Sequence, residues 1–165
     1  MARKVRGPAA LKSAALTIEY EYRMLLVGFL AWGRAPTTEE RNLVLEAFLV
    51  HTRNLRDFFA KSGQSDDILA RDFVSQMPRI AMPYLRSKPF HKRLNRKLAH
   101  LSYSRPRLTS GWERETICRE IEVAMRRFLE RLQEENPRRV PWFGDVPGIL
   151  APLGTVATLA EELEA

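Results

Sequence analysis

The residue types best suited to chemistry are concentrated between positions 87 and 105, in the segment SKPFHKRLNRKLAHLSYSR. On a helix, Arg93, Arg96 and His100 would share one face, because they recur at i, i+3 and i+7. Leucines at positions 94, 98 and 101 would share a different face and be buried. A histidine titrates near neutral pH, and the planar fork of an arginine suits phosphate. This stretch is therefore the first candidate for a functional site.

The composition indicates one globular domain with an excess of positive charge. The chain has 165 residues, of which 45% are hydrophobic and 28% charged, and its formal net charge is +7. Such a length is ordinary for a single domain. The arginine excess favours RNA or another polyanion as a partner. The alternative is that most arginines are ordinary surface charges that pair with acidic residues one helical turn away.

Several kinds of site are excluded by the sequence. Cys118 is the one cysteine, so no internal disulfide and no multi-cysteine zinc site can form, and we expect Cys118 to be a small core residue. The glycine-rich phosphate-binding patterns and the HExxH zinc pattern are absent, so we expect no cofactor and no metal. The longest apolar stretch, Met24–Trp32, has nine residues and is too short to cross a bilayer. We therefore expect a cytoplasmic protein without a membrane partner.

Apolar residues at a period of 3.6 predict two long helices in the first half of the chain. The first should run from Ala9 to Trp32 and end at Gly33. The residues Thr37–Glu40 have the form of a capping box, and the helix that they open should end at Gly63. The apolar face of this second helix carries Val44, Phe48, His51, Leu55 and Phe58. His51 is therefore expected in the core, where a histidine needs a hydrogen-bonding partner.

The second half of the chain is predicted to contain two further principal helices, which are connected by loops. About two turns of helix should follow residues 65–67, and residues 78–89 contain three prolines and are predicted to form a connecting arm. Ser87 is the expected N-cap of a helix that ends before Pro106. A second capping box at Ser110–Glu113 should open the longest helix, which continues to about Asn136.

The predicted fold is all-α: a single-domain antiparallel bundle of about four main helices, with short extra helices and a C-terminal extension. Residues 1–8 are a basic lead-in that should fray, and residues 9–136 form the bundle. Residues 137–165 are a Pro- and Gly-rich apolar extension that should end in a short helix, Thr155–Leu163. An extension of this composition either folds back on the bundle or meets a partner.

Arg93 and His100 are separated by six residues, and this spacing resembles the R-x4–6-H motif of the HEPN superfamily. That superfamily consists of compact helical bundles and includes metal-independent ribonucleases, toxins that pair with antitoxins, and anti-phage proteins. Its motif lies on a late helix of the bundle, and two copies meet across a homodimer. Arg86 and His91 match the same spacing, across a proline that the interior of a helix disfavours.

The resemblance implies roles for four residues of the predicted helix. His100 would be the general base or acid, Arg93 or Arg96 would stabilise the phosphorane, and Asn95 would be a polar modulator. Cleavage of RNA without a metal requires a base for the proton of the 2′-hydroxyl and a cation beside the phosphate.

Three phrases in the sequence together resemble a widespread family of uncharacterised bacterial proteins of similar length. They are HTRNLRDFF at 51–59, DDILARDF at 66–73 and NRKLAHLSYSR at 95–105. The resemblance spans about residues 40–130 and implies no established activity. It draws attention to a set of polar residues that could support a site: His51, Arg53, Asp57, Asp72, Lys97, His100, Tyr103 and Arg105. In one arrangement His51 approaches His100 while Asp57 or Asp72 pairs with an arginine, and in the other these residues form a buried network that fixes helix register.

Two hypotheses of function follow. The first is a HEPN-like, metal-independent endoribonuclease or toxin of a bacterial defence or toxin–antitoxin system, acting as a homodimer with an antitoxin or other protein partner. The second is a non-catalytic helical module that binds nucleic acid or a protein. The first predicts RNA cleavage in EDTA, and the second predicts salt-dependent retention of a polyanion.

Overall fold

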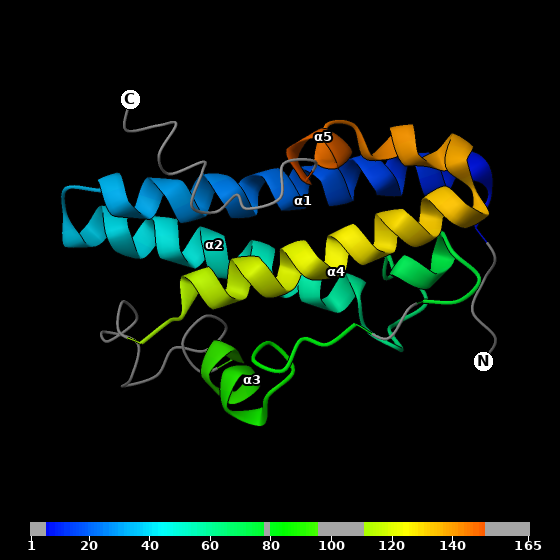
Figure 1. Cartoon of the computed structure of the whole chain (residues 1–165). Coiled ribbons are helices and arrows are strands. Elements are labelled where there is room, and N and C mark those ends of the chain that lie inside the picture. Colours follow the sequence, from blue (N-terminus) through cyan, green and yellow to red (C-terminus); the bar gives the residue numbers. More distant parts are fainter. Residues whose placement is uncertain (1–5, 78–79, 96–110, 151–165) are drawn as a thin grey trace.

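The computed structural model describes residues 6–77, 80–95 and 111–150, and within these ranges it contains helices and loops but no strand (Figure 1). The long helices are α1 (Pro8–Arg34), α2 (Thr38–Phe58) and α4 (Arg114–Glu135). The short helices are η1 (Ala70–Asp72), α3 (Lys88–Leu94), η4 (Pro137–Phe143) and α5 (Val146–Leu150), of which η1 and η4 are 3-10 helices. Both α2 and α4 run antiparallel to α1 (Figure 1). The predicted all-α bundle is confirmed.

Helices α1 and α2 form a closely packed hairpin. The predicted capping box at the start of α2 is present: the Glu40 amide donates to Thr37 Oγ1 at 3.2 Å, and the Thr37 amide donates to Glu40 Oε2 at 3.0 Å. Gly28 of α1 faces Phe48 of α2, and a Cβ at position 28 would lie 3.1 Å from the Phe48 Cβ. That separation is tighter than most side-chain contacts, so a glycine allows the two backbones to approach.

Three predicted boundaries were wrong. Helix α2 ends at Phe58 rather than at the predicted Gly63. At this end of the helix, Phe58 and Phe59 are both buried in the core. Both rings contact Phe128 of α4, and the Phe59 amide donates to the carbonyls of Leu55 and Arg56 where the helix ends. The segment after residues 65–67 forms only the single turn η1, which is closed by the Leu69 amide donating to Asp72 at 3.0 Å.

The third wrong boundary is the start of α4. The N-cap of α4 is Glu113, which makes no capping hydrogen bond with its side chain, rather than the predicted Ser110. Gly111 has a φ of +74°, which a helix does not allow, and Trp112 turns its ring into the core against Phe90. The predicted N-cap of α3 is confirmed, because Ser87 Oγ accepts from the Phe90 amide at 3.2 Å. Residues 96–110 lie outside the described residues, so the predicted continuation of α3 to Pro106 stays a prediction.

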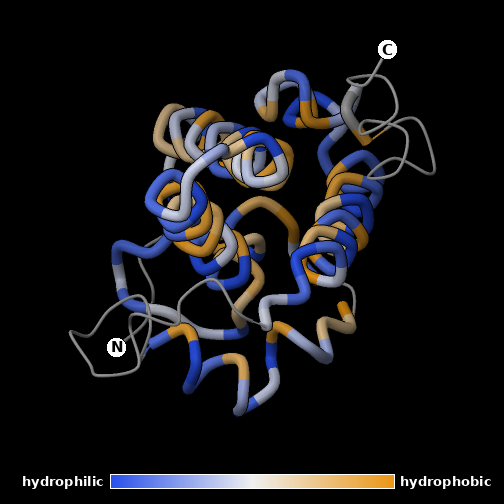
Figure 2. The backbone as a smooth tube through the Cα atoms, turned by 90° about the vertical axis from the view of Figure 1, so that its left-hand side faces the viewer, coloured by the Kyte–Doolittle hydropathy of each residue, from blue (hydrophilic) through white to orange (hydrophobic). Residues whose placement is uncertain are grey.

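The core is organised around aromatic rings. The long helices surround a common interior, seen nearly end-on in Figure 2. The ring of Phe128 from α4 makes edge-to-face contacts with four other phenylalanines, at centroid distances of 5.2 to 6.3 Å: Phe58, Phe59, Phe73 and Phe143. Pairs of this geometry add to the free energy of burial. One ring of α4 thus contacts the end of α2, the segment after η1, and η4.

Two glutamates of α4 hold the chain that leads from η1 to α3, which is called the arm from here on and includes residues 73–77 and 80–87. Glu120 accepts hydrogen bonds from the backbone amides of Tyr84 and Leu85, both at 2.9 Å. Glu135 accepts from the amide and the hydroxyl of Ser75. The arm therefore has few regular elements of its own and is positioned by carboxylates of a neighbouring helix.

The first part of the C-terminal extension folds back on the bundle. Helices η4 and α5 pack against α1 and α4, and Phe143, Val146 and Leu150 are buried in the same core. The Asp145 amide donates to Glu19 of α1 at 3.2 Å. The remaining residues, 151–165, including the predicted helix at 155–163, lie outside the described residues, as do residues 1–5. Within the described part of the chain, no helix combines the length and the apolar character that a membrane span requires.

Replacement of Phe128 by alanine should destabilise the fold severely. The change removes four ring contacts and leaves a cavity, and truncation of a buried phenylalanine costs about 3–5 kcal/mol. Val123→Ala is the matched control on the same helix, because Val123 is 39% exposed and should change the free energy of unfolding by less than about 0.5 kcal/mol. Urea denaturation followed by circular dichroism measures both values, and equal losses would contradict the central role of the aromatic cluster.

Candidate functional site

The predicted catalytic residues are only partly within the described structure. His100 and Arg96 lie outside it, as do Lys97, Tyr103 and Arg105 of the predicted supporting set. Asn95 caps the C-terminal end of α3 and is exposed. The guanidinium of Arg93 lies 4.5 Å from the centroid of the Trp112 ring and donates a hydrogen bond to the Gly111 carbonyl. In the described part of the chain, Arg93 thus connects α3 to the segment before α4.

His51 lies in the core, as predicted, and its partner is a glutamate of α1. Its Nδ1 is 2.7 Å from Glu21 Oε2, and the Asn54 side-chain amide donates to the same oxygen at 3.0 Å. The ring of Tyr20 covers His51 edge-on at a centroid distance of 5.8 Å. These contacts join α2 to α1, and Glu21 and Asn54 are not among the polar residues that the sequence indicated. Glu21 lies on another helix, so no spacing in the sequence relates it to His51.

Asp57 and Asp72 have different partners. Asp57 forms an ion pair with Arg53 at 3.8 Å and accepts two hydrogen bonds from Arg56, at 2.7 and 3.0 Å. Asp72 accepts from the Leu69 amide and closes η1. Of the predicted supporting residues, the structure therefore brings Arg53 and Asp57 together on α2.

The arginines in the second half of α2 lie near enough to His91 of α3 for their charges to act on its titration. We call this group, together with the neighbouring cations of α3, the α2–α3 basic face, and it comprises Arg53, Arg56, Lys88, His91 and Lys92. Lys88 and Lys92 are one turn apart on α3 and are exposed together with His91. Arg56 is the exception, being only 7% exposed, and its Nη1 is buried without a hydrogen-bonding partner in the described structure. A buried guanidinium nitrogen without a partner is costly.

The electrostatic environment of His91 follows from this surface. Its pKa is lowered from the ordinary value of 6.5, first by partial desolvation and then by the positive charge of Arg56. The carboxylate of Asp57 opposes this shift, and Arg53 adds to it. Arg56 and Arg53 therefore disfavour the protonated form of His91. Of the sequence patterns, only the match of Arg86 and His91 to the R-x4–6-H spacing pointed to this histidine.

Arg86 itself has a structural role. Its guanidinium donates to the carbonyls of Ile80 and Phe59, both at 3.1 Å, and so joins the arm to the end of α2. Sequence reasoning also missed Arg56, because its proximity to His91 depends on how α3 packs against α2. No local spacing reports such a contact.

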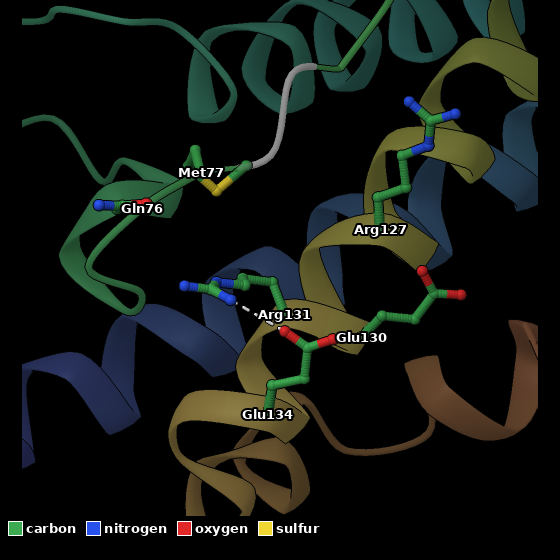
Figure 3. A pocket seen from close by; sticks show the side chains of 6 residues that line it. All are labelled: Gln76, Met77, Arg127, Glu130, Arg131 and Glu134. Carbon is green, nitrogen blue, oxygen red and sulfur yellow. Dashed lines mark hydrogen bonds and ion pairs between the residues drawn. The ribbon is translucent and has the colours of Figure 1, made fainter.

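A hollow of about 360 Å³ lies between the arm and α4 (Figure 3). Its cationic side chains come from α4, where Arg131 pairs with Glu134 at 2.9 Å and with Glu135 at 2.6 Å. Figure 3 shows the carboxylates of Glu130 and Glu134 beside the arginines. Because acidic and basic groups are mixed here, this hollow does not favour an anion.

Metal and thiol chemistry find little support in the described residues. Within them, no group of three or more His, Cys, Asp or Glu side chains is placed to hold a metal ion. Cys118 is buried, which confirms the expected core position, and burial raises the pKa of its thiol to about 12. A thiol of that pKa is protonated at neutral pH and is not a nucleophile.

Comparisons with known proteins add no relative. No protein-family model matches the chain, and the searches of curated proteins and of solved structures gave no match. The geometry of the α2–α3 basic face is therefore the basis for a functional proposal.

The pKa of His91 should respond to its arginine neighbours. Two-dimensional NMR titration should place it below 6.5 in the unaltered protein, and Arg53→Ala should raise it because one repelling charge is removed. Arg23→Ala on α1 is the control and should leave the pKa of His91 unchanged.

The stability of the protein should also depend on pH through His91. Because its pKa in the folded state lies below that in the unfolded state, the unfolded chain binds the proton first, so stability should fall as the pH drops below 6.5. His91→Gln should flatten this part of the pH profile, and an unchanged profile would contradict the assignment.

Proposed function

We propose that the protein binds RNA through the α2–α3 basic face. The supporting observation is that the charges of Arg53 and Arg56 on α2 reach His91 on α3. Arginines bind phosphate oxygens through paired N–H donors, and the lysines of α3 extend the positive charge along the same side. Asp57 is the acidic residue that pairs with both arginines of this group. The net charge of +7 favours a polyanion as the partner.

RNA is favoured over DNA because of the uncharged histidine. A neutral imidazole offers one nitrogen that can accept a hydrogen bond, and the 2′-hydroxyl that could donate it occurs only in RNA. The exposed basic residues on one short helix suit the backbone of a single strand, where electrostatic contacts dominate binding. The resemblance of residues 93–100 to the HEPN motif also favours RNA.

Binding of a labelled single-stranded RNA should weaken with salt, as measured by fluorescence anisotropy across a series of KCl concentrations. The slope of log affinity against log salt reports the number of phosphate contacts. Each of Lys88→Ala, Lys92→Ala and Arg53→Ala should reduce the slope by about one. A single-stranded DNA of the same sequence should bind more weakly than the RNA.

Arg23→Ala serves as the matched control for these variants. Arg23 is an exposed arginine on α1 that is paired with Glu19 and Asp145, away from the proposed face. The variant Arg23→Ala removes the same charge as Arg53→Ala, and it should leave the slope of log affinity against log salt unchanged. If it weakens RNA binding as much as Arg53→Ala does, the binding is non-specific and the α2–α3 basic face is not the site.

A second candidate function is cleavage of the bound RNA, which the uncharged state of His91 specifically favours. Neutral His91 would remove the proton of a 2′-hydroxyl, whose oxygen then attacks the adjacent phosphorus and displaces the 5′-oxygen. The exposed guanidinium of Arg53 would stabilise the charge on the phosphorane. The imidazolium of His91 or a water would then give a proton to the leaving 5′-oxygen, so that the products are a 2′,3′-cyclic phosphate and a 5′-hydroxyl. The HEPN resemblance assigns the same chemistry to His100 with Arg93 or Arg96. In that family a homodimer and an antitoxin partner accompany it.

Cleavage should be measured with 5′-labelled RNA in the presence of EDTA. His91→Ala and His100→Ala should be compared, because loss in the first alone supports the α2–α3 basic face and loss in the second alone supports the R-x6-H motif. His51→Gln is not a suitable control, since His51 supports the fold. RNA that stays intact at micromolar protein would remove the catalytic candidate and leave RNA binding as the function.

A further inference from the structure

A second hollow, of about 530 Å³, lies at the end of α2 and includes no member of the α2–α3 basic face. Three segments line it: the end of α2 with the residues that follow it, the region of η1, and the arm that leads to α3. The lining residues are Phe59, Ala60, Lys61, Ala70, Arg71, Ser75, Met77, Ile80 and Arg86. The volume is within the range of about 300–1,000 Å³ that is typical of small-molecule sites.

The floor of this hollow is apolar. Phe59, Ala70 and Ile80 are each at most 5% exposed, and Ala60 and Met77 continue the apolar surface. A flat, weakly polar group could cover this floor and exclude water from it, which is the usual source of affinity in such pockets.

The rim is cationic, with Lys61, Arg71 and Arg86 around the opening. Arg71 donates to the Lys61 carbonyl at 2.8 Å, and Arg86 donates to the Ile80 and Phe59 carbonyls. These bonds orient both guanidiniums without neutralising them, since a backbone carbonyl carries no net charge. Preorganised donors lose less entropy when a ligand arrives.

No carboxylate is among the described residues that line this hollow. Glu135 reaches Ser75 from α4, but its oxygens are occupied by the Ser75 amide and hydroxyl and by Arg131. The hollow in Figure 3, which shares Met77 as a lining residue, differs because Glu130 and Glu134 stand beside its arginines. Of these two neighbouring hollows, the one at the end of α2 is therefore lined by cations, whereas the one in Figure 3 is mixed in charge.

We infer that this hollow binds a nucleoside monophosphate. Three cations around one opening match a phosphate monoester, whose charge near pH 7 lies between about −1.5 and −2, better than a single carboxylate. Arginine binds such a group through paired N–H donors. The apolar floor would receive the base. The site does not depend on the proposed RNA binding, although it adjoins the α2–α3 basic face through Arg86, one residue before the N-cap of α3.

Isothermal titration of the full chain with AMP tests the site, with adenosine, inorganic phosphate and octanoate as comparison probes. AMP should bind, and each comparison probe should bind at least about tenfold more weakly, because it lacks either the phosphate or the flat base. Arg71→Ala and the exposed Lys61→Glu should each weaken AMP by about tenfold, the value of one charge-assisted hydrogen bond. Arg131→Ala in the hollow of Figure 3 is the matched control and should leave AMP affinity unchanged.

Absence of AMP binding at millimolar concentration would overturn the inference, as would octanoate binding as tightly as AMP. Affinity that is insensitive to both Arg71→Ala and Lys61→Glu would place AMP elsewhere and overturn it as well. The RNA anisotropy measurement is independent of this test. AMP binding without RNA binding would contradict only the proposed function, and RNA binding without AMP binding would contradict only the present inference.

Discussion

The edge-to-face packing of Phe128 against four other phenylalanines is the contact on which the arrangement of the chain depends. Phe58 and Phe59 come from the end of α2, Phe73 follows η1, and Phe143 ends η4. These three segments are far apart in the sequence, and Phe59, Phe73 and Phe143 are not in α-helices. Aromatic rings bury a large apolar area at a low cost in side-chain entropy. One cluster can therefore order loops that have no helical hydrogen bonds of their own, and both the α2–α3 basic face and the hollow at the end of α2 lie beside those loops.

Three carboxylates of the bundle are used inside the structure rather than at the basic face. Glu21 pairs with His51, Glu120 accepts two backbone amides, and Glu135 holds Ser75. Such acids contribute to the fold but do not neutralise the exposed arginines and lysines of α2 and α3. At the α2–α3 basic face itself, Asp57 pairs with Arg53 and Arg56, so its negative charge offsets part of theirs.

The helices were predictable from the sequence where the signals for a helix lie within its own residues. The 3.6-residue period gave the long helices, and the Thr37 capping box and the Ser87 N-cap marked two starts that the structure confirms. The ends were predicted poorly, because α2 ends where Phe58 and Phe59 are buried by other segments, and Gly63 has no part in that. The site was predicted least well. His91 acquires its character from guanidiniums on another helix, and Glu21 finds His51 across the hairpin, so neither contact leaves a spacing in the sequence. Arg53 and Asp57, one turn apart on α2, were the exception.

The clamp made by Glu120 has a consequence for how the binding surfaces could change over time. One carboxylate that accepts two successive amides fixes the direction of the chain at Tyr84 and Leu85, immediately before Arg86. Glu120 of α4 therefore helps to determine the orientation of α3. Substitutions on α4 that shift this carboxylate would change the orientation of α3 and, at the same time, the opening of the hollow at the end of α2. The side chains that contact a ligand would stay the same. Selection could thus adjust recognition through a residue that no ligand meets.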